Sequence, residues 1–555
     1  MFRLSKVIRE KLGVKTILGL TATAPERMIS SVAEQLGVPE NGVIRGPLLP
    51  NNLTLSVSRD GERDVALLSM LSEDGALGEC DSVIVYCTRR EECERIATFL
   101  RTKLQERDIM LSERRANKVR MSATSEPYHA GMTPSRRRTV QNHFMSGKLR
   151  IVVATVAFGM GIDKSDIRAI VHYNMPKTFE SYIQEIGRAG RDGLPARCHL
   201  FLGTEGKDLS ELKRHIYSNS IDRHTLRKLL HLIFEVSDES ENSSVDYKEV
   251  ALSVDTTIEA LDLPEENIST LLCYLESSSF SETEKIPWVK LQNPVYSTCR
   301  IQCYGGPLQL RLAASSNPPL AAAIALQRQK GVDFSGASSL EFPVVDVSSR
   351  MGWNSGVVKK ELKNLEWKST PSGWRKTGII VEFSNLAFHF DALQGLSEKQ
   401  IDKLQNDIFE RSRNQEFSEL SNLLRLHRAF TLVSFKSQSE AVDEFLVERS
   451  DKLKEYVASY FSDSEKILDE VKTIPEHCEE DQDIRNKVRA FVSSHVDHTW
   501  NGRAVARIFH GIQSPNFPAK QWGRVYKYWR SHLHIDFNIL VKIASEEVLR
   551  MRTGD

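Results

Sequence analysis

Apolar residues are grouped along this chain in runs of the length and spacing of buried strands. Four runs predict such strands: SVIVYC at 82–87, RIVVATVAF at 150–158, AIVHYNM at 169–175 and CHLFLG at 198–203. Helical stretches such as EECERIATFLRTKL, which follows the first run, alternate with them. Alternating strands and helices over 51–205 predict a parallel sheet with helices on its faces.

The N-terminal stretch predicts a strand, a turn and a helix over residues 15–38. KTILGLTAT is a β-rich apolar run, and ERMISSVAEQLG after Pro25 predicts a helix that ends at Gly37. A strand needs neighbours, and only 14 residues precede this one. We therefore expect the chain to begin inside a fold.

A second pattern occupies residues 206–395. Segment 251–277 predicts two helices separated at Pro264, and a β-rich stretch follows at 288–304. Segment 342–390 repeats this plan with two helices around the turn WNSG and then a hairpin. Helix, turn, helix and hairpin is the order of a winged helix, although other small α+β units share it. We interpret this region as winged-helix-like, with two copies in tandem.

The remaining residues predict two further regions. Residues 396–483 combine an amphipathic helical part, up to 462, with a linker whose residues 463–483 hold nine acidic and two basic side chains. Residues 484–555 predict a small C-terminal domain that is basic and aromatic. A prior of roughly 150 residues per domain also suggests three or four domains for 555 residues.

Composition narrows the class of protein. Lys+Arg and Asp+Glu both number 74, so any nucleic-acid site must come from local segregation of charge. With 40% hydrophobic and 27% charged residues, the chain has the composition of a globular protein and not of a disordered one. Its eight cysteines are too few for a disulfide scaffold of 555 residues. No apolar run approaches the roughly 18 residues that span a bilayer, so we expect no membrane partner.

The strongest chemical signal is SYIQEIGRAGRDG at 181–193, which places Arg188 and Arg191 three residues apart among glycines. Arginine presents a rigid fork of donors to phosphate oxygens and stays charged at cellular pH. A phosphoryl-transfer site uses such a group to neutralise charge in the transition state. A lone GRxGR more often forms a basic surface turn, so the interpretation depends on the surrounding residues.

Those residues favour a phosphate site. Thr155 follows a predicted strand, GlyMetGly at 159–161 predicts a tight turn, and the Asp163 carboxylate is suited to a ribose hydroxyl or a nearby arginine. Other polar residues follow strands or occupy turns elsewhere: Thr21, Thr23, Thr88, Arg89, Arg90 and His129. Each alone is weak, but their order and spacing together indicate one site.

This series resembles the C-terminal half of RecQ-type superfamily 2 DNA helicases. LTATA resembles motif III, VIVYCTRRE motif IV, VVATVAFGMGIDK motif V and QEIGRAGRDG motif VI. The stretch 502–537 and the insertion 101–127 resemble the Rothmund–Thomson-type branch. The resemblance implies an α/β fold: a remnant of a first RecA-like lobe at 1–50, a RecA-like C-terminal lobe at 51–205, α+β winged-helix-type domains, and a helical, basic C-terminal unit.

The resemblance also implies the nucleotide chemistry. Arg191 would be the arginine finger that reaches the γ-phosphate of ATP bound with Mg²⁺, and Arg188 would lie beside it. Gln184 and Asp163, with Gly161 in the same turn, would contact motif VI and the ribose.

For nucleic acid, the resemblance implies 3′–5′ movement on single-stranded or branched DNA, in nuclear replication and repair. Thr88 and Thr155 would hold DNA phosphates, with Arg89 and His129 nearby. Thr21 and Thr23 would couple the ATP state to the grip on DNA.

Half of the expected nucleotide site is not found in the sequence. Neither GxxxxGK[ST] nor a DExH tetrapeptide occurs. Without the loop and the lysine that hold the β- and γ-phosphates, we expect the chain to be inactive alone. An incomplete or truncated helicase is one hypothesis, and a non-catalytic DNA-binding or assembly fragment is the alternative.

Charge segregates in two regions outside these motifs. Residues 101–150 carry twelve Lys/Arg against four Asp/Glu, and 499–535 carry six against none, interleaved with aromatics. In the second region we expect exposed basic residues that contact DNA, among them Arg503, Arg507 and Lys527. The aromatics either stack on bases or form the domain's own core. In the second winged-helix candidate, Lys359 and Lys363 would reach a DNA backbone or would be ordinary solvated lysines.

Cys299 and Cys303 form a CxxxC pair that could hold zinc. Tetrahedral zinc needs four ligands, and Cys273 and the Cys198–His199 dipeptide lie elsewhere in the sequence. The resembled branch carries a zinc-binding domain after its motor, whereas buried free cysteines are the more common outcome.

Overall fold

The computed structural model divides the chain into two compact units, each built from two stretches of sequence. The first unit comprises Met1–Ile216 and Phe417–Pro475, and the second comprises Tyr217–Glu416 and Glu476–Asp555. The structure describes residues 7–21, 23–112, 125–159, 161–235, 246–281, 286–331, 336–371, 373–441, 443–462 and 481–553. Among them, no helix combines the length and the apolar character needed to cross a membrane.

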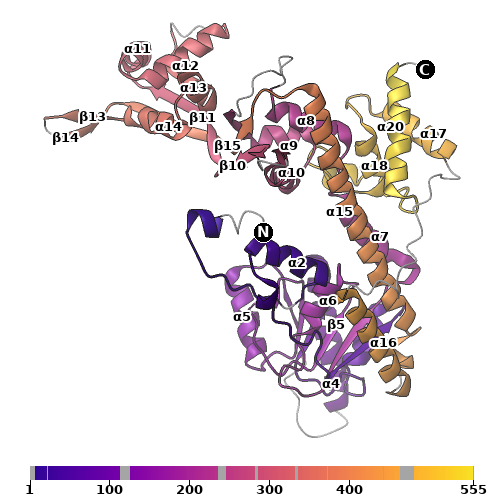
Figure 1. Cartoon of the computed structure of the whole chain (residues 1–555). Helices are drawn as coiled ribbons and strands as arrows, with labels where there is room; N and C mark the ends of the chain where they lie inside the picture. The colour runs from indigo at the N-terminus through magenta and orange to yellow at the C-terminus, as the bar shows by residue number, and fades with distance from the viewer. Residues whose placement is uncertain are drawn as a thin grey trace. The chain divides into compact units, whose positions relative to one another are not determined.

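A six-stranded parallel sheet forms the centre of the first unit (Figure 1). Its strand order is β1-β6-β5-β2-β4-β3. The strands are β1 (Leu53–Ser58), β2 (Val83–Tyr86), β3 (Ser125–Tyr128), β4 (Ile151–Ala154), β5 (Ala169–His172) and β6 (Ala196–Phe201). The four expected strands are confirmed as β2, β4, β5 and β6, and the sheet has two edge strands more, β1 and β3.

Helices cover both faces of this sheet because successive residues of its strands point to opposite sides. Val83 and Val85 pack in one apolar core with α3 and α4, whereas Ile84 and Tyr86 pack in the other with α5 and α6. The helices are α3 (Arg63–Leu71), α4 (Arg90–Ser112), α5 (Pro134–Met145), α6 (Phe179–Ile186) and α7 (Lys207–Tyr217).

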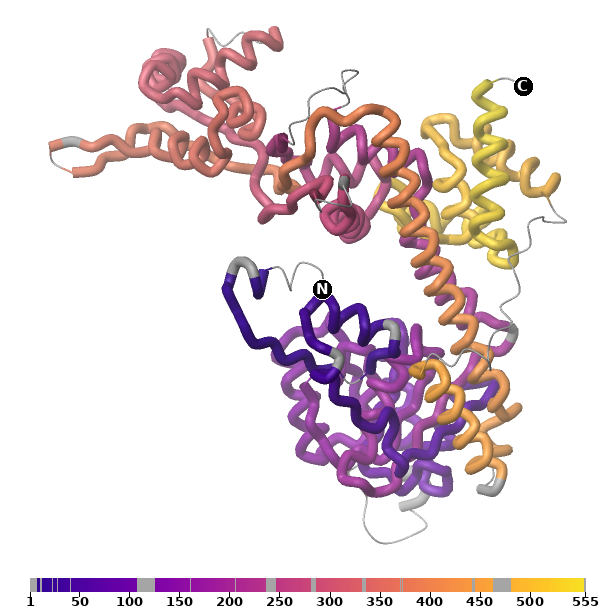
Figure 2. The backbone as a smooth tube through the Cα atoms, viewed as in Figure 1, coloured from indigo at the N-terminus to yellow at the C-terminus, as the bar shows by residue number. Residues whose placement is uncertain are grey.

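A helical arm from the later part of the chain completes the second of these cores. The expected helices of 396–462 are confirmed as α15 (Glu398–Val433) and α16 (Asp443–Phe461). From residue 417 onward they pack in the core with α5 and α6, so this part is not a separate region (Figure 2). Phe430 lies 5.1 Å from Tyr182 between ring centroids, and the Phe435 N–H donates to Val57 O at 2.9 Å beside β1. The predicted acidic linker lies almost wholly outside the described residues.

The N-terminal stretch confirms one predicted element and not the other. Helix α2 (Glu26–Leu36) ends at Gly37, whose φ of 61° is left-handed and favours glycine. The predicted strand is wrong, because the described residues 13–21 form none. A strand requires a partner for its backbone groups, and this segment pairs with no described strand.

The second unit repeats one order of elements: a strand, two helices, a two-stranded hairpin and a strand. The first copy is β7 (Tyr247–Ser253), α9 (Val254–Leu261), α10 (Glu265–Ser277), β8 (Ser279–Ser281), β9 (Ile286–Pro287) and β10 (Val289–Leu291). The second is β12 (Ser339–Pro343), α13 (Val344–Met351), α14 (Ser355–Asn364), β13 (Trp367–Thr370), β14 (Gly373–Lys376) and β15 (Ile379–Leu393). The helix break at Pro264 and the helix pair around WNSG are confirmed.

The hairpin predicted within 342–390 is shorter than expected. It comprises only β13 and β14, whereas β15 is a single strand of 15 residues. The first part of β15 pairs with β11 (Val295–Cys303), and its last part pairs with β7 and β10. The long strand therefore belongs to two apolar cores, one for each copy.

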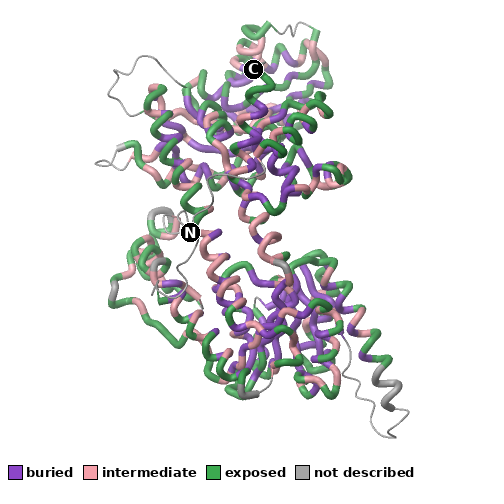
Figure 3. The backbone as a smooth tube through the Cα atoms, turned by 90° about the vertical axis from the view of Figure 1, so that its right-hand side faces the viewer, coloured by how far each residue is buried: buried purple, intermediate pink, exposed green. Residues whose placement is uncertain are grey.

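Helices make up the rest of the second unit: α8 (Arg223–Ile233), α11 (Gly306–Ser316), α12 (Pro318–Gln329), α17 (Asp481–Ser494), α18 (Gly502–His510), α19 (Ala519–Trp522) and α20 (Phe537–Thr553). Most aromatics of the C-terminal part are buried against one another, among them Trp500, Phe509 and Trp522, whereas Tyr526 is exposed. Buried and exposed residues alternate along α20, which leads to the C-terminus (Figure 3), whereas every residue of α18 is buried. Most of the aromatics thus form the domain's own core.

Candidate functional site at the carboxyl ends of the parallel strands

Three polar residues expected to contact DNA lie at one edge of the sheet. Thr88, His129 and Thr155 follow β2, β3 and β4, which are neighbouring parallel strands. The Thr88 N–H donates to Asn174 Oδ1 at 3.0 Å, from the loop after β5. The strand order therefore places these loops in one row at the carboxyl ends of the strands, where open α/β sheets bind their ligands.

Not every residue of this row presents its side chain to solvent. Thr88 and Arg89 are exposed and Thr155 is half-buried, but His129 is buried. The His129 Nε2 lies 3.0 Å from Glu94 Oε1, and Arg89 donates to Glu211 Oε2 at 2.8 Å. Of these four residues, Thr88 and Arg89 are therefore the most accessible to solvent.

Arg188 is buried against the glycine turn. Its Nη1 donates to the carbonyl of Gly159, a residue with a φ of 134°. A side chain at position 159 would overlap the Arg188 guanidinium, so only glycine fits there. Arg188 consequently holds the turn after β4 against the end of α6.

Arg191 is the more accessible of the two arginines, with 39% of its side chain exposed. It donates to Asp163 Oδ1 at 3.2 Å, to Ile162 O at 3.3 Å and to Gly187 O at 3.4 Å. Of the two partners expected for Asp163, the structure therefore shows the arginine. This guanidinium is held at the protein surface with part of its donor capacity facing solvent.

The remaining predicted nucleotide contacts lie on the same unit. Gln184 is exposed on α6, and Gly161 is exposed in the turn with a φ of 78°. Farther toward the N-terminus, the Thr23 N–H donates to Thr21 Oγ1 at 3.3 Å. Thr21 is exposed and Thr23 is half-buried.

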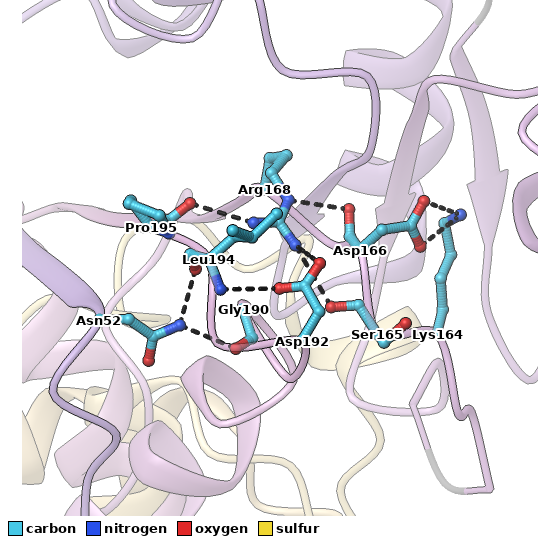
Figure 4. A network of polar contacts seen from close by, with 9 residues as sticks. All are labelled: Asn52, Lys164, Ser165, Asp166, Arg168, Gly190, Asp192, Leu194 and Pro195. Atoms are coloured by element: carbon cyan, nitrogen blue, oxygen red, sulfur yellow. Dashed lines mark hydrogen bonds and ion pairs between the residues drawn. The ribbon is translucent and has the colours of Figure 1, made fainter.

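A polar network around Asp192, the residue that follows Arg191 in the chain, was not predicted from the sequence (Figure 4). It joins Asn52, Arg168 and Asp192, which come from the start of β1, the start of β5 and the loop after α6. Asp192 lies within the recognised GRAGRDG stretch, but nothing in the sequence singled out its partners. A second unpredicted pair is buried: His172 Nε2 lies 2.6 Å from Glu185 Oε2.

In the second unit, the two predicted lysines are partly engaged. Lys363 donates to Val381 O and Glu366 Oε1, both at 2.8 Å. Lys359 is half-buried, and this burial lowers its pKa, opposed by the Glu249 carboxylate. Their charges are thus partly compensated within the protein.

The cysteine pair does not fit a zinc site. Cys299 and Cys303 are buried on β11 in an apolar cluster, and burial raises the pKa of Cys299 to about 12. Zinc binds the thiolate, which such surroundings disfavour. Within the described ranges, no three His, Cys, Asp or Glu residues gather closely enough to hold a metal. These thiols pack as small apolar groups.

Two predicted DNA contacts of the C-terminal part are buried, contrary to expectation. Every residue of α18 is buried, Arg503 and Arg507 included. Arg503 pairs with Asp222 at 2.9 Å and donates to Leu261 O at 3.0 Å, and Arg507 donates to Ser218 O at 2.9 Å. Both guanidiniums are thus bound to carbonyl or carboxylate oxygens inside the unit. Lys527, in contrast, is exposed as predicted.

Comparisons with known proteins find similarity to helicases. The helicase conserved C-terminal domain matches residues 65–193. Human ATP-dependent DNA helicase Q4 is 40% identical over 99% of this chain and 48% of its own length. ATP-dependent DNA helicase Q-like 5 of Arabidopsis thaliana is 27% identical over 98% of this chain and 54% of its own. This chain spans about half the length of the curated relatives it matches.

Among solved structures, the E. coli DEAD-box protein SrmB bound to RraA is 20% identical, covering 31% of this chain and 87% of that chain, with a TM-score of 0.23. The parallel sheet and the matched domain define the first unit as a RecA-like helicase C-terminal lobe. The similarity to the Q4 and Q-like 5 helicases extends over nearly the whole chain, well beyond this lobe. Over nearly its whole length the chain is similar to RecQ-type helicases of superfamily 2.

Proposed function

We propose that this chain is the C-terminal portion of an ATP-dependent 3′–5′ DNA helicase that unwinds DNA in nuclear replication and repair. ATP, with Mg²⁺, would bind between this lobe and a preceding one. The observation that carries the proposal is the position of Arg191, which is held by Asp163 and Ile162 O at the surface with part of its side chain exposed.

In this mechanism Arg191 neutralises charge that develops on the γ-phosphate. Asp163 keeps the guanidinium in place before the nucleotide arrives, and Gln184 and Gly161 contact the nucleotide from the neighbouring surface. Arg188 acts differently, because it is buried on Gly159 O. It fixes the glycine turn and so supports the surface that meets the nucleotide.

The DNA strand would cross the row of loops after β2, β4 and β3. The Thr88 and Thr155 hydroxyls and the Arg89 guanidinium suit phosphate oxygens, which accept hydrogen bonds from such groups without regard to sequence. His129 would support this row through Glu94, 3.0 Å away. Lys359, Lys363 and Lys527 would add contacts from the second unit.

The proposal is tested by replacing Arg191 with alanine in the full-length protein. Loss of an arginine finger lowers phosphoryl transfer by about 10³-fold or more, so we expect DNA-stimulated ATP hydrolysis to fall by that order while DNA affinity stays within about twofold. Arg95→Ala is a matched control, because Arg95 is half-exposed and paired with Asp64 on the other face of the sheet. Hydrolysis that survives Arg191→Ala at the control level contradicts the proposal.

A second candidate function is that of a non-catalytic DNA-binding or assembly fragment. It is favoured by the hairpin β13–β14, where Trp374 is 71% exposed among exposed Lys368, Arg375 and Lys376. This chain alone would then bind single-stranded or branched DNA with a salt-dependent affinity and turn over no ATP. The coding sequence upstream of Met1 distinguishes the gene's function from that of this product: an in-frame GxxxxGK[ST] and DExH box would support the helicase.

A further inference from the structure

The loop that carries Arg191 is held from several sides by Asn52 and Arg168, which lie outside the recognised motifs, and by Asp192 within its own motif. We name residues 187–194 the arginine loop. Among the residues that the structure describes, Arg191 itself makes three hydrogen bonds, of 3.2–3.4 Å, to Asp163 Oδ1, Ile162 O and Gly187 O. The position of its guanidinium therefore depends on the backbone of the loop.

Arg168 fastens the far side of the loop through an acidic side chain. It pairs with the Asp192 carboxylate and donates to Pro195 O at 3.2 Å, just beyond the loop. It also donates to Asp166 O at 3.2 Å and Ser165 O at 3.4 Å, so one guanidinium joins two segments (Figure 4). The Leu194 N–H donates to Asp192 Oδ1 at 3.0 Å and closes the loop on itself.

Asn52 fastens the loop from the sheet side. Its amide donates to Gly190 O at 2.8 Å and to Leu194 O at 2.7 Å. Gly190 has a φ of 61°, and a side chain there would overlap the Asn52 amide. The loop is consequently closed around Asn52, with Arg191 at its outer turn.

We propose that Arg168, Asp192 and Asn52 are positioning residues that hold Arg191 in the geometry that phosphoryl transfer requires. The inference rests on the proposed helicase function and goes beyond it, because none of the three reaches the nucleotide-facing groups directly. A displacement of about 1 Å of a catalytic group costs up to about 100-fold in rate.

The test measures steady-state ATP hydrolysis and DNA binding for Arg168→Ala, Asn52→Ala and Asp192→Asn in the full-length protein. Asp192→Asn keeps an acceptor for the Leu194 N–H but loses the charge, so it preserves the loop if the alanine variants fold poorly. We expect kcat to fall about tenfold or more, with KM for ATP and DNA affinity within about twofold. Arg95→Ala remains the matched control for the loss of an ion pair.

A double mutant separates positioning from general stability. In an Arg191→Ala background, Arg168→Ala has no further effect on kcat if it acts through Arg191, because residues that act as a unit are not additive. Independent, multiplying losses overturn the inference, as do single variants that match Arg95→Ala. If Arg191→Ala itself leaves hydrolysis intact, the proposed function fails instead.

Discussion

At the scale of single residues, burial decides what each arginine of this chain does. Arg150 is buried and donates to Leu71 O, Leu77 O, Gly78 O and Cys80 O, so its guanidinium holds this loop. Arg507 is likewise buried, and burial lowers its pKa to about 9. Arg191, in contrast, keeps part of its side chain in solvent. The sequence marks Arg191 by its motif, but it shows Arg507 only as one basic residue of a basic region, which is why Arg507 was wrongly predicted to be exposed.

Gly159→Ala tests how tightly Arg188 is packed. The substitution forces a φ of 134° on alanine and overlaps the Arg188 guanidinium. We expect a loss of about 1–3 kcal/mol in the free energy of local unfolding around β4, measured by hydrogen exchange. Gly61→Ala is the control, since it has open space around it and should change stability by about 0.5 kcal/mol at most. Equal effects of the two variants would contradict the packing argument.

His199 gives the first unit a dependence on pH. It is buried between Ser56 Oγ at 2.8 Å and Ser58 Oγ at 2.9 Å, and burial lowers its pKa from 6.5 to about 4. Between these two values the unfolded chain binds a proton that the folded unit does not. Stability should therefore fall as pH drops from 6.5 to 4, by up to about 1.4 kcal/mol per pH unit from this group.

Hydrogen exchange in β1 and β6 is the suitable measurement. Tryptophan fluorescence would not report on this unit, because every tryptophan lies in the second unit. His199→Gln should flatten the pH dependence over this range relative to the unmodified chain. An unchanged slope would mean that other groups cause it.

At the scale of elements, the buried strands were predictable because they are apolar on both faces. β2, β4 and β5 are fully buried over their whole length, and β6 nearly so, and each is bounded by turn residues. The edge strand β3 contains Glu126 and Pro127, which fit an edge but carry no strand signal. The row of Thr88, Thr155 and His129 follows from the order of these strands. The fastening of the arginine loop does not, because Asn52 and Gly190 meet only through tertiary packing.

The helical arm 417–461 supplies a prediction at the same scale. Phe430 is fully buried against Phe179 and Tyr182. Phe430→Ala should lower the free energy of unfolding of the first unit by about 3–5 kcal/mol, because it removes a large core side chain. Hydrogen exchange in α6 and β1 measures it, and Phe417→Ala, at a side chain 55% exposed, is the control. A Phe430→Ala variant as stable as the control would show that the arm is dispensable.

At the scale of the whole molecule, neither unit is continuous in sequence. The chain completes residues 1–216, then residues 217–416 of the other unit, and only afterwards returns to add 417–461 to the first core. Composition and periodicity predicted the helices of this arm but not their destination. An amphipathic pattern indicates that one face of a helix is buried, but it does not indicate which surface covers that face.

This interleaving has a consequence for synthesis on the ribosome. The lobe that carries Arg191 leaves the ribosome early, yet the apolar face behind β1 and α6 stays uncovered until some two hundred further residues have been translated. Nascent chains would need protection by chaperones during that interval. A premature stop codon between residues 217 and 417 would leave the core of this lobe incomplete, although the residues of motifs III to VI had already been translated.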